Sequence, residues 1–343
     1  MAIVVRRTPF LQVTGPNDED MLKTWGSRLI GVKLIDRDGD VSDEAIFMFT
    51  RKPPYVAVPG ENAPFTVKVG WSSTSVAITG VYLFQRTHIF GAPKRGQQIH
   101  FICRAADLAE YLKRVDSQHF GEDNGHKTLD DVFKSLFRSS GKQVIVHPDI
   151  AKQALPGGYM LRWNQSAVDF ASDLADGFTG TVKVMDDKVL VLKRGSGESA
   201  TGQKLPTITL KYDENYEFDV ELEPRFQFQK VSASYLDTDK GTLEREDKTS
   251  GQGQNGDALP HPFPSKDAAA AAAASVAQAW QANAGQGLFT SHGLPEAVAG
   301  APVKCQGYGS PIDETDWISS TVTNDIIPDR GWTTTVETEV QPY

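Results

Sequence analysis

The feature that most constrains the fold of this chain is an alternation of apolar and polar residues in short runs, interrupted by proline and glycine. Successive side chains of a strand point to opposite faces of a sheet, so such a run has one buried and one exposed face. We therefore expect an antiparallel sheet that curls into a barrel or sandwich over residues 1–106. The runs are VKLID, EAIFMFT, FTVKVGW, VAITGVYLF and QIHFICR, separated at Pro53-Pro54, Pro59-Gly60, Gly80 and Gly91-Ala92-Pro93.

Helical spacing replaces this alternation after residue 106. AADLAEYLKRV and TLDDVFKSLFRSSG place apolar residues three and four apart, and the second segment ends in Ser-Ser-Gly, which predicts a helix stop. QVIVH predicts a short strand, and WNQSAVDFASDLADGF predicts a helix with Asn164 or Ser166 as its N-cap. TVKVMDDKVLVLKR predicts a hairpin around Asp186-Asp187. A small α/β module is expected at 107–195.

The segment GSGESATGQKLP predicts a polar linker, beyond which strand-like runs return. These runs are TITLKY, KVSASYL, PVKCQGYG, DWISSTVTN and WTTTVETEV. We expect them to form a second tube-like β unit over 196–343. The predicted fold class is therefore mainly β, with two tube-like β-barrel domains and a small α+β module between them.

The second β unit contains one predicted helix and one predicted loop. The helix is the Ala-rich segment at about 265–284, in which Ser265 can cap the N-terminus and Asp267 suits the positive end of the helix dipole. Gly285 is expected to take the left-handed conformation that ends it. The polar stretch 237–260 predicts a long mobile loop at a surface or contact site.

Size and composition agree with a chain of several packed units. The 343 residues predict two or three domains, and no apolar run approaches the roughly 18 residues that a membrane helix needs. The N-terminus lacks the order of regions of a secretion signal, so we expect folding in a cytoplasm and no stable membrane association. Cys103 and Cys305 are too few for a disulfide framework and are interpreted as small buried hydrophobic residues.

The net charge of −9 argues against a protein that holds nucleic acid through its phosphates. Its 44 acidic residues outnumber 35 basic ones, and an acidic surface repels DNA.

Three aspartates at alternate positions, Asp36, Asp38 and Asp40, invite comparison with a calcium loop. An EF-hand that began at Asp36 would need glycine at its sixth position and a bidentate glutamate at its twelfth. This chain has Val41 and Phe47 there. The flanking runs alternate like strands, so Asp38-Gly39 is interpreted as a hairpin turn.

The segment HFGEDNGH gathers His119, Glu122, Asp123 and His126 within eight residues. A zinc motif of the HExxH kind needs its histidines one helical turn apart, whereas these are seven residues apart in a polar stretch with glycine. We interpret the segment as a solvated connector between modules.

Motifs of hydrolytic enzymes are missing from the sequence. There is no GxSxG elbow, no Gly-rich phosphate loop and no Cys/His pair with a recognisable signature. GSGES at 195–199 has no strand-turn-helix context, and Asn164-Gln165-Ser166 matches a glycosylation acceptor by letters alone. Paired carboxylates of a glycosidase cannot be recognised without the fold. No catalytic, cofactor-binding or metal-binding residue is predicted.

The order of features resembles the phage late control D family, the baseplate hub proteins of contractile-tailed phages and related particles. Two departures from relatives are Asn324, where a histidine is common, and a longer polar stretch at 237–260. The resemblance rests on Ile35-Asp36 through Gly39 to Ser42-Asp43, Pro59-Gly60, VKVGW, Gly80, GAPKRGQQIHFICRAADL, TLDDVFKSLF, WNQSAVDFASDLADGFTGTVKVMDDKVLVL, GLPEAVAGAPVKCQGYGSPIDETDWISSTVTN and GWTTTVETE.

The resemblance implies a homotrimer in which each subunit supplies two β-barrels to a pseudo-sixfold ring. Such a ring would join the sixfold tail tube to the threefold central spike and form part of the DNA channel. The implied partners are the spike protein, the tail tube or tube-initiator protein, baseplate wedge proteins and the tape measure protein, with DNA only in transit. The implied place is the tail baseplate of a virion assembled in the host cytoplasm, and the implied role is structural rather than enzymatic.

Two alternatives stay open at this point. One is a cell-wall hydrolase built on β domains, and the other is a glycan- or peptide-binding role for the module at 107–195. For the hub, the expected contact elements are the hairpin Leu34 to Phe49, the stretch 237–260 and exposed strands of both β units. The sequence does not distinguish an infectious phage from a tail-like bacteriocin or another injection machine.

Overall fold

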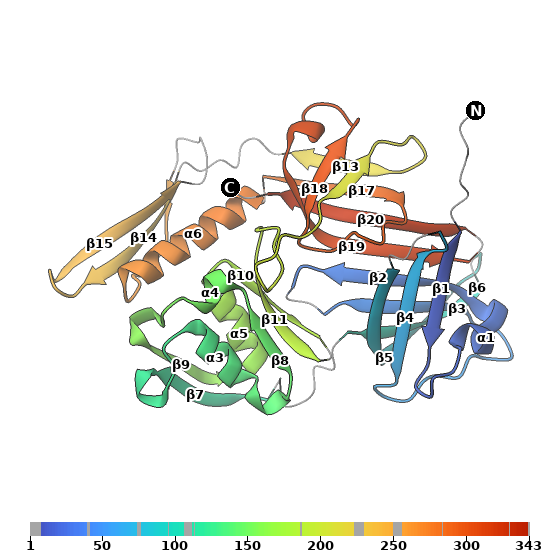
Figure 1. The fold of residues 1–343 in the computed structure, drawn as a ribbon, viewed down its shortest axis with the longest axis horizontal. Helices are drawn as coiled ribbons and strands as arrows, with labels where there is room; N and C mark the ends of the chain where they lie inside the picture. Colours follow the sequence, from blue (N-terminus) through green and yellow to red (C-terminus); the bar gives the residue numbers. More distant parts are fainter. Residues whose placement is uncertain are drawn as a thin grey trace.

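The computed structural model describes residues 8–39, 42–73, 77–94, 96–105, 112, 114–185, 187–222, 230–249, 256–282, 284–328 and 330–341. The chain is mainly β with few helices, as predicted. Two groups of strands lie side by side, an α/β module lies next to both, and a helix with a small sheet projects from the C-terminal part (Figure 1). No helix within these ranges is long and apolar enough to cross a membrane.

The N-terminal β unit contains the five strands that the alternation predicts. An additional strand, β1, precedes them, and β5 continues through Gly91 and Ala92, where the sequence predicted a break. β5 is long because it turns the corner of the unit: its first half pairs with β4 and its second half with β6. The elements are β1 (Pro9–Thr14), α1 (Met21–Trp25), β2 (Leu29–Arg37), β3 (Glu44–Thr50), β4 (Pro64–Trp71), β5 (Ala77–Ala92) and β6 (Gly96–Arg104).

Aromatic side chains fill the core of this unit. Trp25 of α1 contacts Phe47, Phe49 and Phe65, with ring centroids 5.0–5.8 Å apart. All four residues are almost fully buried. Because alternate residues of β3 and β4 point into this core, the hydrophobic burial that stabilises the unit also fixes the register of its strands.

The C-terminal β unit contains β12 (Ile208–Lys211), β13 (Phe218–Leu222), β17 (Gly285–His292), β18 (Pro302–Gln306), β19 (Trp317–Ile327) and β20 (Gly331–Val340). β12, β18, β19 and β20 match predicted runs, whereas β13 and β17 were not predicted. Gly285 begins β17 in extended conformation, so its predicted role as a left-handed helix stop is wrong. β17 begins three residues after the last residue of the helix α6 (Lys266–Ala282), so the backbone becomes extended at once.

One sheet runs through both β units, which the sequence had indicated as separate. Strands of the two units join where Val32–Arg37 of β2 pairs with Thr321–Ile326 of β19. This pairing supplies hydrogen-bond partners to an edge strand of each unit and connects segments almost 300 residues apart in the sequence. In the described part of the chain the path stays open at β1 and β13, and closure into barrels remains a prediction. The strand order is β1-β4-β5-β6-β3-β2-β19-β20-β17-β13.

The α/β module has the predicted helices α3 and α5 and the predicted strands β8, β10 and β11, whereas β7, α4 and β9 were not predicted. Ser166 caps α5 by accepting the N–H of Asp169 at 3.0 Å, which selects it over Asn164. The segment AADLAEYLKRV, predicted as a helix, lies largely outside the described residues. Asp186, part of the predicted hairpin turn, also lies outside them. The elements are β7 (Asp116–Gly121), α3 (Leu129–Leu136), β8 (Gln143–Val146), α4 (Pro148–Ala151), β9 (Tyr159–Gln165), α5 (Ala167–Asp176), β10 (Gly180–Val184) and β11 (Lys188–Lys193).

The stretch 237–260 is not the long loop that its polarity predicted. It contains β15 (Thr242–Thr249) and β16 (Gly256–Ala258), both paired with β14 (Lys230–Asp237). The helix α6 (Lys266–Ala282) packs on this small sheet through Ala269, Ala273 and Ala277. Ser265 caps α6 as predicted, because its hydroxyl accepts the N–H of Ala268 at 3.2 Å. We call 230–282 the arm.

Candidate functional site

Asp36 and Asp43, near the turn of the β2–β3 hairpin, lie at a junction of three parts of the chain. Lys183 of β10 extends from the α/β module and donates to Asp36 Oδ1 at 2.5 Å and to the Arg37 carbonyl at 2.9 Å. Its Nζ also lies 2.9 Å from Asp43 Oδ1. The other oxygen of Asp36 accepts the N–H of Ala299 in the C-terminal unit at 2.9 Å. One carboxylate therefore connects both β units and the module.

The cluster is largely shielded from water. The side chains of Lys183 and Asp43 are 11% and 12% exposed. Burial disfavours the charge of Lys183, but Asp36 and Asp43 outweigh it and raise the lysine pKa. Burial also raises the pKa of Asp43 to about 6, against the opposing effect of Lys183. At neutral pH the junction holds a charged, hydrogen-bonded group whose members depend on one another.

The predicted turn at Asp38-Gly39 brings the hairpin against the module. Gly39 has φ of +92°, and a Cβ there would lie 2.0 Å from Thr181 Oγ1. Only glycine permits this approach. Asp40, the third aspartate, lies outside the described residues, and no cluster of three or more metal-binding side chains occurs within them.

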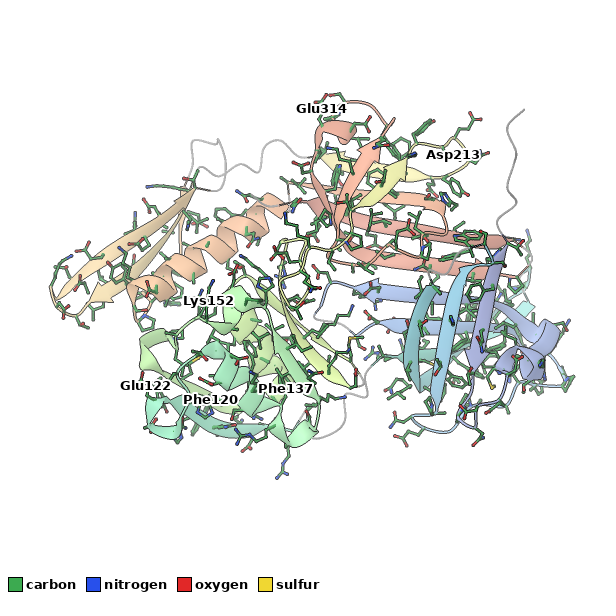
Figure 2. The ribbon with its side chains drawn as sticks, viewed as in Figure 1. Phe120, Glu122, Phe137, Lys152, Asp213 and Glu314 are labelled. Carbon is green, nitrogen blue, oxygen red and sulfur yellow. The ribbon has the colours of Figure 1, made fainter. Side chains whose placement is uncertain are left out.

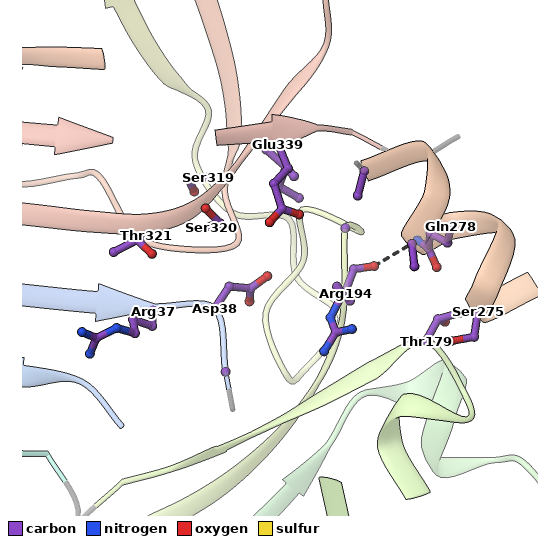
Figure 3. A pocket seen from close by; sticks show the side chains of 15 residues that line it. Arg37, Asp38, Thr179, Arg194, Ser275, Gln278, Ser319, Ser320, Thr321 and Glu339 are labelled. Carbon is purple, nitrogen blue, oxygen red and sulfur yellow. Dashed lines mark hydrogen bonds between the residues drawn. The ribbon is translucent and has the colours of Figure 1, made fainter. Parts of the chain in front are cut away.

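A cavity of about 450 Å³ opens beside this junction, between the hairpin, β19, β20, the end of β11 and α6 (Figure 3). Asp38 borders it, and burial raises the pKa of Asp38 to about 6 although Lys183 and Arg194 oppose the shift. Gln278 of α6 donates to the Arg194 carbonyl at 3.1 Å. The cavity is thus a polar space where the arm, the module and the long sheet meet.

The long sheet has a second surface, which we call the outward face, formed by residues that alternate with the core residues of each strand. In β20, Trp332, Thr334, Val336 and Thr338 are buried, so the residues between them point outward. Cross-strand pairing continues this face from β13 to β5. Its main residues are Asp219, Glu221, Gln286, Leu288, Thr333, Thr335, Glu337, Glu339, Thr321, Thr323, Asp325, Lys33, Ile35, Arg37, Glu44, Ile46, Met48, His100, Arg104, Arg86 and His88.

Charges in the middle of the outward face are paired within the chain. Lys33 lies 3.3 Å from Asp325 across the β2–β19 boundary. Glu44 lies 3.2 Å from Arg37 and 3.4 Å from Arg104. These partly exposed pairs lie on the four neighbouring strands β19, β2, β3 and β6 and leave the centre of the face close to neutral.

The β13 end of the outward face is acidic. Asp219, Glu221, Glu337 and Glu339 surround an open groove of about 340 Å³. In the described part of the chain none of the four carboxylates forms an ion pair. β13 pairs only with β17 there, so this acidic end coincides with a free strand edge.

The opposite end of the face carries Arg86 and His88 on β5, next to His100 and Arg104 on β6. Burial, followed by the nearby charges of His88 and Lys33, lowers the pKa of His100. Arg86 carries positive charge at this end, and Arg104 shares Glu44 with Arg37. Beyond Leu83, β5 pairs only with β6 among the described residues, which leaves a second free edge.

The other residues considered in the sequence lie apart from these surfaces. His119 lies in β7 and its Nε2 is 3.7 Å from Asp123 Oδ2, while Glu122 and His126 follow in the same module. The segment belongs to the fold of the module, so its interpretation as a connector between modules is wrong. Its residues are mostly polar and do not alternate with apolar ones, so the strand β7 was not recognised in the sequence. Figure 2 shows Phe120 inside the module and Glu122 at its surface.

The two cysteines are buried and free, as predicted. Burial raises the pKa of Cys103 and of Cys305 to about 12. A thiol with such a pKa is a poor nucleophile.

Lys183 and Asn324 are the important residues that sequence reasoning missed. A lysine in VKV has the appearance of an exposed strand residue, and no sequence signal pairs it with Asp36. Asn324 had one signal, its departure from the histidine common in relatives. It is buried, and its Oδ1 accepts Trp332 Nε1 at 3.0 Å and Thr334 Oγ1 at 2.6 Å.

Comparisons with known proteins bear on these surfaces. No protein-family model matches the chain. The chain is 24% identical over 366 residues to the probable baseplate hub protein of Escherichia phage P2. The alignment covers 95% of this chain and 92% of the relative. The predicted resemblance to phage baseplate hub proteins is confirmed.

The probable baseplate hub protein of Escherichia phage 186 is also 24% identical to this chain. That alignment covers 95% of this chain and 91% of the phage 186 protein. Among solved structures, the 43 kDa tail protein of prophage MuSo2 from Shewanella oneidensis has a TM-score of 0.70 at 14% identity, covering 98% of this chain and 99% of that one. The shared fold therefore spans both β units, the module and the arm.

Proposed function

We propose that this protein is the structural baseplate hub of a contractile phage tail or of a phage-like particle. The observation that carries the proposal is similarity to two baseplate hub proteins over 95% of the chain. Such a protein works through its interfaces, and the described residues contain no cluster suited to a metal and no reactive thiol. We keep 1–106, 107–195 and 196–343 as the proposed domains.

In this function the chain forms a homotrimer. Each subunit contributes two β units, so three subunits supply six around the axis and match a sixfold tube to a threefold spike. The free edges at β13 and at the distal half of β5 support a head-to-tail ring, because heterologous contacts that close into a ring cover both edges of every subunit. The acidic β13 end then meets Arg86 of the next subunit.

The outward face is the proposed lining of the DNA channel. It is continuous across both β units and its central charges are paired within the chain. The chain as a whole is acidic, with a net charge of −9, and this charge repels the phosphates of passing DNA. Spike, tube or tube-initiator, wedge and tape measure proteins are the proposed partners, and the baseplate of a virion assembled in the host cytoplasm is the proposed location.

The structure changes which predicted contact elements suit this role. Both strands of the hairpin Leu34 to Phe49 lie in the middle of the long sheet, so only its outward residues are available to a channel. The stretch 237–260 is part of the arm, whose exposed tip residues Leu236 and Leu243 face each other in the β14–β15 register. The arm is the proposed contact for a neighbouring baseplate protein.

The native mass of the purified protein, alone and with its candidate spike, tests the proposal. We expect a trimer of about three times the 37.5 kDa chain, formed or tightened by the spike. A monomer in both samples would contradict the hub function, and clearing of peptidoglycan in a zymogram would favour the hydrolase instead.

Charge-reversal variants test the ring contact. The double variant Glu221→Lys/Glu337→Lys should weaken the trimer, and adding Arg86→Glu to the same chain should restore it in part, because every interface of the ring then brings lysine against glutamate. Glu314→Lys is the matched control, since Glu314 is an exposed acid of the same unit (labelled in Figure 2) that lies in the short helical turn Ile312–Glu314, outside the strands that form the outward face. A trimer that tolerates the double variant would place the contact elsewhere.

A further inference from the structure

An exposed aromatic surface lies on the side of the α/β module formed by β7 and β9, away from β10 and β11, which adjoin the β units (Figure 1). Tyr159, Leu161 and Trp163 occupy alternate positions of β9 and are 53%, 47% and 73% exposed. His119 of β7 lies across from Leu161. The His119 ring is stacked on that of Tyr159, with the two ring centroids 6.2 Å apart. We call these four residues the aromatic platform.

The polarity of β9 is the reverse of that of an ordinary half-buried strand, in which the polar side chains face water. Here Arg162 points into the module and is 5% exposed. Its Nε donates to the Gln165 carbonyl at 2.8 Å, and its Nη2 donates to the Arg114 carbonyl at 3.2 Å. The charged side chain is therefore used to hold the strand, while the large apolar ones are left at the surface.

The platform is rigid and open. Phe120, the β7 residue after His119, is fully buried and stacked on Phe170 of α5, so β7 is fixed to the module core. Gly121 lies opposite Tyr159 in the register of β7 and β9. Ser117 Oγ accepts the N–H of Asn164 at 3.0 Å at the other end. A pre-ordered aromatic surface loses little conformational entropy when a partner binds.

Exposed carboxylates border the platform at both ends. Glu122 and Asp123 follow β7 next to Tyr159, and Asp123 Oδ2 lies 3.7 Å from His119 Nε2. Asp116 begins β7 at the end where Trp163 lies. This combination is complementary to an apolar segment flanked by lysine or arginine, whose cations would find both the carboxylates and the faces of the aromatic rings.

We propose that the aromatic platform is a docking site for a protein partner that presents an extended apolar segment with basic residues at its ends. Trp163 and Tyr159 act as the anchors, since buried aromatic side chains supply most of the binding energy in such interfaces. The inference goes beyond the hub function, because it assigns a partner to a surface that the ring and the channel do not use.

A peptide selection tests the proposal with the full chain. A random peptide library displayed on yeast is enriched on the wild-type protein after depletion on Trp163→Ala. We expect enriched sequences that combine Lys or Arg with aliphatic or aromatic residues. Their affinity should fall by about tenfold or more in Trp163→Ala and Tyr159→Ala, and should weaken as salt is added.

Tyr55→Ala is the matched control, because Tyr55 is an equally exposed aromatic residue of the N-terminal β unit, 59% exposed. It should bind the selected peptides as the wild type does. Absence of enrichment, or enrichment of sequences without basic residues, would overturn the proposal. So would Trp163-dependent binding of cell-wall oligosaccharides on a glycan array. The native mass of Trp163→Ala should equal that of the wild type, which separates this test from that of the ring.

Discussion

Lys183 of the α/β module donates a hydrogen bond to Asp36 of the N-terminal hairpin, 147 residues earlier in the chain. Because Asp36 also accepts the N–H of Ala299, the bond fixes the module against both β units at once.

Replacement of Lys183 by methionine should destabilise the protein by about 3–5 kcal/mol, because Asp36 and Asp43 would be left as buried charges without their counter-ion. Urea unfolding measures the loss. Lys188→Met is the control: its Nζ lies 3.7 Å from Asp187 in an exposed pair, so its loss should cost under about 1 kcal/mol. Equal effects would contradict the structural role of the junction.

The stability of the junction should depend on pH through Asp38. Burial raises its pKa from 3.8 to about 6, although Lys183 and Arg194 act against the shift and Asp36 and Glu339 reinforce it. The folded state thus binds this proton more tightly than the unfolded state, so the contribution of Asp38 to the unfolding free energy falls as pH rises from 3.8 to about 6.

Asp38→Asn removes this dependence. Relative to the variant, the wild type should lose about 1 kcal/mol of stability between about pH 5 and about pH 7.5. Urea unfolding of both proteins at the two pH values measures it, with Asp187→Asn as an exposed control. A difference that does not change with pH would show that Asp38 is ionised normally.

Asn324→Leu should destabilise the protein by about 2–4 kcal/mol, because Trp332 Nε1 and Thr334 Oγ1 both lose their buried acceptor. Thermal unfolding gives the change. Thr323→Val, on the half-exposed outward face one residue earlier, should have an effect under about 1 kcal/mol. If Asn324→Leu were as stable as wild type, the buried hydrogen bonds would contribute nothing net.

Gly293→Ala should destabilise the contact between the two β units. A Cβ at Gly293 would lie 2.1 Å from Trp332, whose ring is stacked on Trp71 at 5.0 Å. The Gly293 carbonyl also accepts Trp71 Nε1 at 2.9 Å. We expect a loss of about 1–3 kcal/mol in urea unfolding.

Gly60→Ala is the matched control for this prediction, since an added Cβ there meets nothing within 4 Å. It should leave the unfolding transition almost unchanged. A stable Gly293→Ala would mean that the two tryptophans can separate without cost.

Most strands of the long sheet could be predicted because one of their faces is buried. β3 is a clear case: Phe47 and Phe49 alternate with half-exposed residues. β15 is the opposite case, because TLEREDKT is polar on both faces and lies at an edge of its small sheet. An edge strand with little burial leaves no alternation to detect.

The candidate sites were harder to predict. Asp36 was recognised as unusual, but its partner Lys183 could not be identified, because only the packed fold brings β10 to the hairpin. The aromatic platform was missed for the same reason. The sequence of β9 alone does not show whether Met160 or Leu161 faces the core, because that depends on how β7 and α5 pack against the strand.

The sequence by itself determined most of the strands and helices that bury one face, since their periodicity, caps and turn residues are local properties. It also determined the resemblance to baseplate hub proteins. The tertiary structure alone decided that β2 pairs with β19, that Lys183 reaches Asp36, and that the outward face runs unbroken through both β units. Such contacts join residues far apart in the chain, and their energies depend on packing and desolvation that no local pattern records.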